Sequence, residues 1–318
     1  MRSFCMIALA ASVTVLALAQ RPATQRLVAA GNLIQHGRYT DAIDSLLPLA
    51  RDASLEPRER GRAQMLLGLA NRDLWRMTDA ENFYGEALDT FIRGHEKAED
   101  YANVLDCMAT LELAKGDWHT AEKRLKEAAQ IDRRRGAHAG LAEIDLHLAA
   151  VALQRKRFKD AQKYLDAAHA EIPLAAPHQS ELMADADGLH GWIASLRGEV
   201  EEAAAAYRVA LEDCKKTYGE RHPLTAWVYL LAGRSAFNAG GVELGLAQMR
   251  TGLQILGDAL GTENAEYATG ELAYAAILKK SGKQAEGDAI HAEAVGLLAS
   301  TVRSCANCTV SVWSLRNR

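Results

Sequence analysis

The sequence is poor in residues that break helices and in residues that favour strands. Its 318 residues include only six prolines, and Phe, Trp and Tyr together make up 6% of the chain. Ala and Leu recur throughout and are strong helix formers, whereas aromatic residues are enriched in strands. Because 49% of the residues are hydrophobic, the chain has enough apolar surface for a core. The composition therefore predicts a folded, all-α protein.

An excess of charge of one sign is also missing. The formal net charge is −4, and the longest cluster of like charge is the short "DRRRG" at residues 132–136. Without a basic patch, nucleic acid is not expected as a partner. With only 25% charged residues, the chain is not expected to be disordered either.

The longest apolar run is too short to be a typical membrane span. It extends from Phe4 to Ala19, whereas a spanning helix needs roughly 20 residues. Arg2 precedes this run, and the small residues "ALA" end it just before Gln20. This pattern predicts a signal peptide at residues 1–19, cleaved after Ala19, and export to the periplasm or the cell envelope. An uncleaved membrane anchor is the alternative.

The rest of the chain contains a repeat. Each unit has a turn, often with glycine, followed by a small residue; successive small residues are 38 to 42 positions apart. These residues are Ala42, Ala80, Ala121, Ala161, Ala203, Gly245 and Gly287. Twelve positions before each lies a second series, Ala30, Gly68, Ala109, Ala149, Gly191, Gly233 and Ala275. Seven positions after each lies a third, Leu49, Ala87, Ala128, Ala168, Ala210, Gly252 and Ala294.

The spacing predicts pairs of antiparallel helices. Apolar residues follow three- and four-residue steps on both sides of each turn, and two helices approach closely where the side chains at their crossing are small. One such hairpin cannot bury its apolar face alone, so neighbouring hairpins stack into a solenoid.

These features resemble the tetratricopeptide repeat family. The resemblance rests on the small-residue series and on turns such as Gly37 with Tyr39 and Gly116 with Trp118, and it covers residues 24–300. The period is longer than the usual 34 residues. With "YGERHP" at residues 218–223, it is similar to the kinesin-light-chain-like subclass. HEAT and armadillo repeats share a period near 40 but are not expected to show this small-residue pattern. The resemblance implies a right-handed α-solenoid of about seven hairpins, followed by a tail at residues 301–318.

The segment around His222 has charged neighbours that suggest a reactive loop. Gly219 suits the end of a helix, and Pro223 suits the first turn of the next one. We therefore predict a helix boundary here. His138 and His147 lack the spacing of metal ligands, and neither H-E-x-x-H nor G-x-S-x-G occurs. No catalytic residue, metal site or cofactor is predicted.

Cysteine is the remaining candidate for chemistry. Cys107 stands among apolar residues, so we expect it in the core. The even count of Cys107, Cys214, Cys305 and Cys308 after cleavage suggests disulfides in an exported protein. Cys305 and Cys308 form a "CANC" motif in the tail and are interpreted as a disulfide with each other or as free thiols. Redox or metal-binding work by the Cys305/Cys308 pair is the alternative.

The resemblance implies a concave groove, lined by the first helix of each hairpin, that binds a peptide or protein segment. The family's groove-facing offsets fall on Arg62, Met65, Arg72, Asn103, Asp106, Glu143, Trp192, Trp227, Arg234 and Asn238. Trp and Arg dominate binding hot spots. The alternative for either tryptophan is that its side chain packs between helices. We predict a non-enzymatic interaction scaffold with a protein or peptide partner. A thiol-active accessory protein is the second function class, and a homo-oligomer through the last helix is left open.

Overall fold

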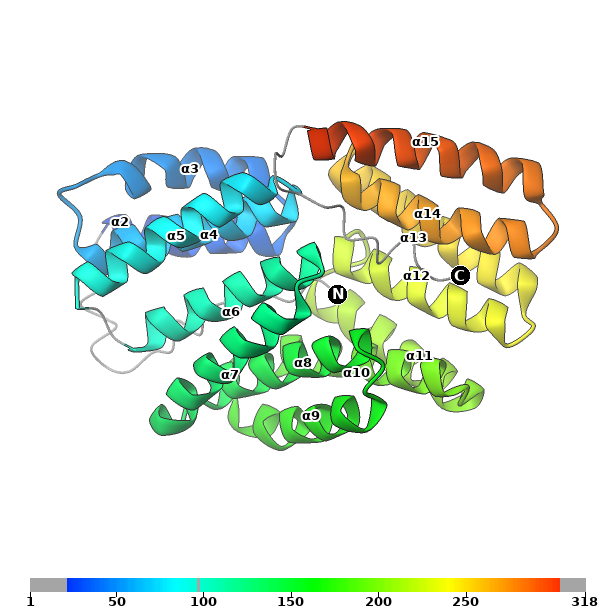
Figure 1. Cartoon of the computed structure of the whole chain (residues 1–318), viewed down its shortest axis with the longest axis horizontal. Coiled ribbons are helices and arrows are strands. Elements are labelled where there is room, and N and C mark those ends of the chain that lie inside the picture. Colours follow the sequence, from blue (N-terminus) through cyan, green and yellow to red (C-terminus); the bar gives the residue numbers. More distant parts are fainter. Residues whose placement is uncertain (1–21, 96–97, 304–318) are drawn as a thin grey trace.

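The computed structural model describes residues 22–95 and 98–303 and consists of helices in this part of the chain (Figure 1). Fourteen α-helices form seven antiparallel hairpins, which confirms the predicted right-handed α-solenoid. The helices are α2 (Pro22–Gln35), α3 (Tyr39–Arg51), α4 (Pro57–Asp73), α5 (Met77–Arg93), α6 (Ala98–Lys115), α7 (Trp118–Arg135), α8 (His138–Gln154), α9 (Phe158–Glu171), α10 (Gln179–Arg197), α11 (Val200–Thr217), α12 (Pro223–Asn238), α13 (Val242–Leu260), α14 (Ala265–Lys280) and α15 (Gln284–Arg303). A short 3-10 helix, η1 (Ile172–Leu174), follows α9.

The two helices of a hairpin have different surroundings. The first helices, α2, α4, α6, α8, α10, α12 and α14, contact the first helix of the neighbouring hairpin as well as their own partner. Accordingly α8 is buried on almost every side between Leu141 and Leu153, whereas α9 buries only the stripe of Ala161, Leu165 and Ala168. The first helices therefore form the inner layer of the curved array, and the second helices cover its outside (Figure 1).

The small-residue series predicted from the sequence mark the helix crossings. Every member of the three series is buried. One close crossing joins α12 and α13: a Cβ added at Gly233 would lie 2.7 Å from the carbonyl oxygen of Gly245, and one added at Gly245 would lie 2.7 Å from that of Gly233. No side chain fits between these two backbones, which explains why glycine replaces alanine there.

The turns inside the hairpins place one residue in the left-handed conformation, which glycine adopts without steric cost. Five hairpins use glycine, and these are Gly37, Gly116, Gly198, Gly240 and Gly282. The second and fourth hairpins place Trp75 (φ 60°) and Lys156 (φ 57°) at the corresponding position. The turn of the second hairpin, "LWRMTDA" at residues 74–80, contains no glycine. It therefore keeps the backbone conformation of the other turns by holding Trp75 in a strained conformation.

The predicted helix boundary around His222 is confirmed. Gly219, after α11, has φ +97°, and Pro223 is the first residue of α12. His222 does more than separate two helices, because its Nδ1 accepts a hydrogen bond from the Leu224 backbone N–H at 3.2 Å and so caps α12.

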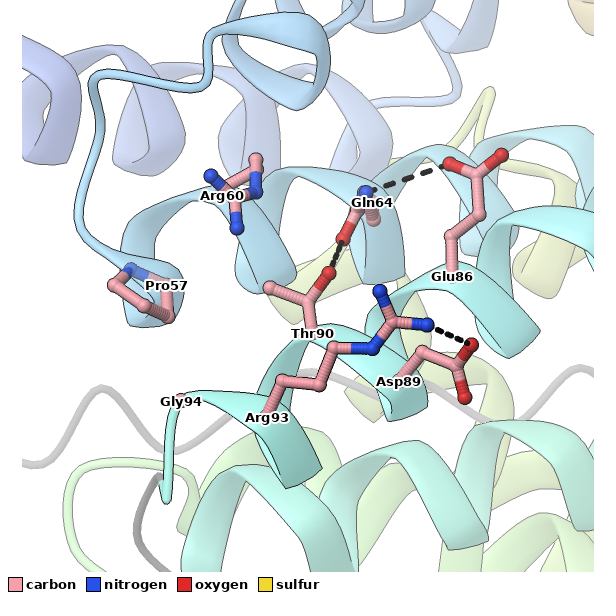
Figure 2. A pocket seen from close by; sticks show the side chains of 8 residues that line it. All are labelled: Pro57, Arg60, Gln64, Glu86, Asp89, Thr90, Arg93 and Gly94. Atoms are coloured by element: carbon pink, nitrogen blue, oxygen red, sulfur yellow. Dashed lines mark hydrogen bonds and ion pairs between the residues drawn. The ribbon is translucent and has the colours of Figure 1, made fainter.

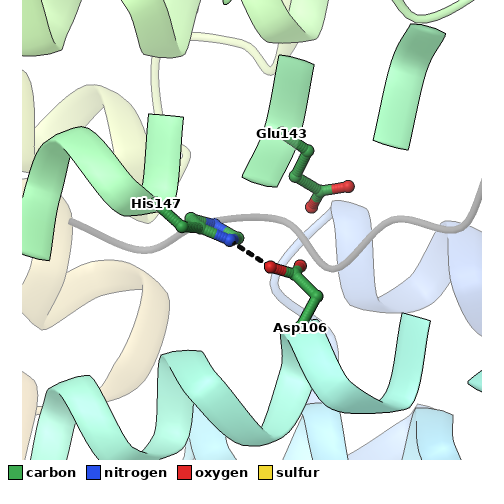
Figure 3. A group of neighbouring side chains, drawn as sticks. All are labelled: Asp106, Glu143 and His147. Carbon is green, nitrogen blue, oxygen red and sulfur yellow. Dashed lines mark hydrogen bonds and ion pairs between the residues drawn. The ribbon is translucent and has the colours of Figure 1, made fainter. Parts of the chain in front are cut away.

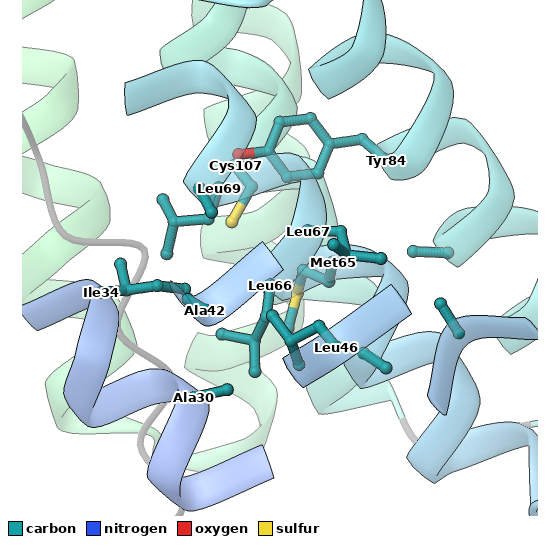
Figure 4. Close-up of a cluster of buried hydrophobic side chains, with 14 of the residues drawn as sticks. Ala30, Ile34, Ala42, Leu46, Met65, Leu66, Leu67, Leu69, Tyr84 and Cys107 are labelled. Atoms are coloured by element: carbon teal, nitrogen blue, oxygen red, sulfur yellow. The ribbon is translucent and has the colours of Figure 1, made fainter. Parts of the chain in front are cut away.

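The core is divided into clusters that follow the hairpins. The cluster of the first three hairpins contains Ile34, Leu46, Met65, Tyr84 and Cys107 (Figure 4). Cys107 is fully buried, which confirms its predicted place in the core. Cys214 is also buried, and it is a free thiol.

Some core contacts join hairpins far apart in the sequence. Leu260, at the end of α13, packs against the cluster of the first three hairpins. Trp75 packs against the cluster of α14 and α15. A Cβ at Gly37 would lie 3.6 Å from the ring of Pro223. The array thus curves until its last hairpins touch its first two (Figure 1).

Three predictions fall outside the described residues. They are the signal peptide at residues 1–19, the predicted tail at residues 301–318 apart from its first three residues, which belong to α15, and the Cys305/Cys308 disulfide. Among the helices of the described part, none is long and apolar enough to span a membrane.

Candidate functional site

The inner layer carries polar side chains that link the first helices of successive hairpins. On α4, Arg58 and Arg62 both donate to the carboxylate of Asp100 on α6, at 2.7 and 2.5 Å. Asp100 is fully buried, so two guanidinium groups balance one desolvated carboxylate. The predicted groove residue Arg62 therefore holds two hairpins together.

Arg72, another predicted groove residue, lies almost three turns further along α4 and is buried. Its Nε and Nη2 donate to Asp73 Oδ1 at 2.9 and 2.8 Å, and its Nη1 donates to Thr110 Oγ1 on α6 at 2.6 Å. Planar guanidinium groups suit such a fork of contacts. This contact again joins the second and third hairpins.

Three titratable side chains meet between α6 and α8. The Nδ1 atom of His147 lies 2.6 Å from Asp106 Oδ1, and Glu143, one helical turn before His147, points at the same place (Figure 3). One ligating atom from each of the three lies within 4.8 Å of the other two. His147 is 1% exposed and Asp106 is 4% exposed, so these two side chains are shielded from water, whereas Glu143 is half-buried.

The acidic character continues on α10. Desolvation, together with the neighbouring Glu181, raises the pKa of Asp185 to about 7. Burial raises the pKa of Tyr218, at the end of α11, and Asp185, Glu181 and Glu143 raise it further. These carboxylates therefore share one neighbourhood across α8 and α10. Together with Asp106 they lie along α6, α8 and α10 of the inner layer, and we call Asp106, Glu143, Glu181 and Asp185 the acidic row.

The two predicted hot-spot tryptophans pack with core side chains. Trp192 is 7% exposed and packs in the core cluster of α8, α9 and α10, so packing between helices describes it in this structure. Trp227 is half-buried in the cluster of α12 to α14, and its indole N–H donates to the Glu266 carboxylate. The two tryptophans thus lie in different core clusters and do not form one stacking surface.

The other predicted residues differ in exposure. Arg234 is half-buried, and burial lowers the pKa of its guanidinium. Asn238 is exposed at the end of α12, and Asn103 is half-buried on α6. Their role in binding a partner stays a prediction.

The sequence analysis missed the convergence of His147 with Asp106 and Glu143. The available signal was the i, i+4 pair of Glu143 and His147, which places both side chains on one helix face. Asp106 stands 41 residues before His147, close to one repeat, so stacking brings it to the neighbouring position. Spacing within one helix alone does not reveal such a site.

A second candidate is a pocket of about 440 Å³ between α4 and α5. Its polar side chains pair with one another: Thr90 donates to Gln64 at 2.8 Å, Gln64 donates to Glu86 at 3.4 Å, and Arg93 donates to Asp89 at 3.4 Å (Figure 2). The complete lining is Pro57, Arg60, Gln64, Glu86, Asp89, Thr90, Arg93 and Gly94. The pocket brings together ordinary surface contacts of one hairpin, and the inner layer is the stronger candidate.

Comparison with known proteins agrees with this architecture. Residues 191–224 match the tetratricopeptide repeat family model. A Rap protein complexed with competence and sporulation factor aligns with a TM-score of 0.64 at 12% identity, over 88% of this chain and 77% of its own. NprR in complex with its cognate peptide NprX aligns with a TM-score of 0.64 at 12% identity, over 89% of this chain and 78% of its own.

The Cut9 assembly with Hcn1 aligns with a TM-score of 0.60 at 16% identity, over 86% of this chain and 48% of that one. A search of curated protein sequences found no significant match. The resemblance to tetratricopeptide repeat proteins is thereby confirmed at the level of the fold. At such low identity, the likeness supports the architecture alone.

Proposed function

We propose that the chain is a non-enzymatic interaction scaffold whose inner layer binds an extended protein segment carrying Lys or Arg. The observation that carries this proposal is the acidic row, since Asp106, Glu143, Glu181 and Asp185 come from three successive first helices. A positive segment complements the partly exposed Glu143, Glu181 and Asp185, with the buried Asp106 behind them, and such complementarity favours correct partners and faster encounter.

Two comparisons support binding of a segment on this kind of array. NprR was solved with its cognate peptide, and Rap was solved with competence and sporulation factor. Both chains share the curvature of the present array over most of their length. Because a signal peptide is predicted at residues 1–19, we propose that the scaffold works in the periplasm or cell envelope.

Panning a library of random peptides, displayed on phage, against the full chain tests this proposal. We expect enrichment of sequences with two or more Lys or Arg residues. The variant D106N/E143Q/D185N removes three charges of the acidic row and should lose the enrichment. The matched control E81Q/E86Q/D89N removes three charges from the outer helix α5 and should keep it.

Two outcomes contradict the proposal. One is an absence of basic enrichment on the unmodified chain. The other is an equal loss in both triple variants, which would show that total charge rather than the inner surface attracts the peptides. Circular dichroism at 222 nm confirms that each variant has kept its helices before it is panned.

A further inference from the structure

The group between α6 and α8 has the composition of a metal site. It offers one imidazole and two carboxylates from two adjacent first helices, with ligating atoms within 4.8 Å of one another. Imidazole and carboxylate together suit Zn²⁺ and neighbouring divalent transition metals, whereas Mg²⁺ and Ca²⁺ prefer oxygen ligands alone. Three protein ligands with an open fourth position are common for zinc.

The distances allow a single ion to be shared. Two ligands at about 2.0–2.1 Å from one tetrahedral zinc ion lie roughly 3.3 Å apart. The Nδ1 atom of His147 is 2.6 Å from Asp106 Oδ1. Coordination through this nitrogen therefore requires the two side chains to separate by less than about 1 Å, a shift that small rotations of χ angles provide.

His147 gives an observation independent of the acidic residues. Its side chain is almost fully buried, and within the described residues its Nε2 atom has no hydrogen-bond partner. A buried polar nitrogen in this state costs free energy. An ion bound through Nε2 removes this cost, whereas an ion bound through Nδ1 leaves it, so the two ring nitrogens are alternative donors to the metal.

Other His–carboxylate contacts in the described part of the chain lack this convergence. His138 Nδ1 lies 2.6 Å from Glu171, and His190 Nε2 lies 2.8 Å from Glu202. Each joins one imidazole to one carboxylate, and both are more exposed than His147. These two contacts are simple His–carboxylate hydrogen bonds, so His138 and His190 serve as matched controls for His147.

From this convergence we infer that Asp106, Glu143 and His147 bind one divalent transition-metal ion, with Zn²⁺ as the probe. The ion would neutralise two carboxylates of the inner layer and fix α6 to α8. No metal site was predicted from the sequence. Because Asp106 and Glu143 also belong to the acidic row, bound metal should weaken the basic-peptide binding proposed above, whereas zinc binding itself does not require a peptide.

The test is zinc binding by the full chain, purified without a histidine tag, freed of metal with a chelator and titrated calorimetrically. The background C305S/C308S removes the cysteine pair of the tail as a competing site. We expect one zinc ion per chain. H147Q should weaken binding by at least about 100-fold, the upper end of the loss caused by removing a residue that merely supports a ligand. H138Q and H190Q should bind as tightly as the background.

Cobalt substitution gives a second readout that does not depend on a folded variant. The bound Co²⁺ should show absorption bands of nitrogen and oxygen ligands without a thiolate charge-transfer band. E143Q, whose side chain is half-buried, replaces H147Q if the latter loses its helicity. The inference is overturned if the background binds no zinc, if H138Q weakens binding as much as H147Q, or if the cobalt spectrum shows sulfur.

Discussion

The contact between Gly233 and Gly245 gives a sharp prediction about stability. Alanine is a better helix former than glycine by about 1 kcal/mol, so helix propensity alone predicts that Gly233→Ala stabilises α12. The structure predicts the opposite. The new Cβ would lie 2.7 Å from the Gly245 carbonyl oxygen and 2.6 Å from Met249 Cγ.

The expected magnitude follows from what has to move. The contact with the oxygen is about 0.7 Å shorter than ordinary van der Waals contact, and a backbone oxygen cannot rotate away as a side chain does. The two helices must separate, and overpacking of this kind costs typically 1–3 kcal/mol. After the gain in propensity, Gly233→Ala should lower the free energy of unfolding by up to about 2 kcal/mol.

Gly85→Ala is the matched control, because Gly85 lies inside α5 and a Cβ there meets nothing within 4 Å. This variant should raise the free energy of unfolding by about 0.5–1 kcal/mol. Urea titration followed by circular dichroism measures both values. Equal shifts for the two variants, or a stabilising shift for Gly233→Ala, would refute the reasoning that backbone contact dictates glycine at this crossing.

Three other substitutions probe strain, an unmet hydrogen bond and charge burial, all by the same urea titration. Lys156→Gly should stabilise the chain by up to about 1 kcal/mol despite adding a glycine, because Lys156 holds a left-handed conformation that costs other residues roughly 1–2 kcal/mol; a loss of stability would contradict this. Tyr84→Phe should be neutral or stabilising, because the buried Tyr84 hydroxyl has no hydrogen-bond partner within the described residues; a loss above about 1 kcal/mol would reveal a contact. For Asp132, burial raises the pKa to about 6 from 3.8, although Arg135 opposes the shift. The folded state therefore holds this proton more tightly, and its stability falls as the pH rises from about 4 to 6. The advantage of Asp132→Asn should grow over that window to at most about 3 kcal/mol at pH 7, and an advantage that does not change with pH would exclude this explanation.

The architecture was predictable from the sequence because one physical requirement recurs in every unit. Two helices cross closely only over small side chains, so Ala80, Ala121 and their counterparts reveal the number of hairpins and their positions. The helix boundary at His222 followed from the backbone preferences of Gly219 and Pro223.

The inner layer was less predictable. Periodicity assigns Arg62 and Asp106 to the face of a helix but does not say which side chain of the next hairpin reaches them. That depends on how far neighbouring hairpins are rotated, which brings Asp100 to Arg62 and His147 to Asp106. The same is true of Trp192, because its position on a first helix does not reveal that its side chain packs in the core of the adjoining hairpin.

The contacts between the first two and the last hairpins have a mechanical consequence. In a solenoid whose units contact only their neighbours, small rotations at every junction add up to a large change of pitch. Here Trp75 packs on the cluster of α14 and α15, and the turn at Gly37 meets Pro223. Contacts between its first and last hairpins therefore hold the array in a closed, ring-like shape. A partner wider than the closed ring has to break these contacts to enter, so part of its binding free energy is spent on opening the ring.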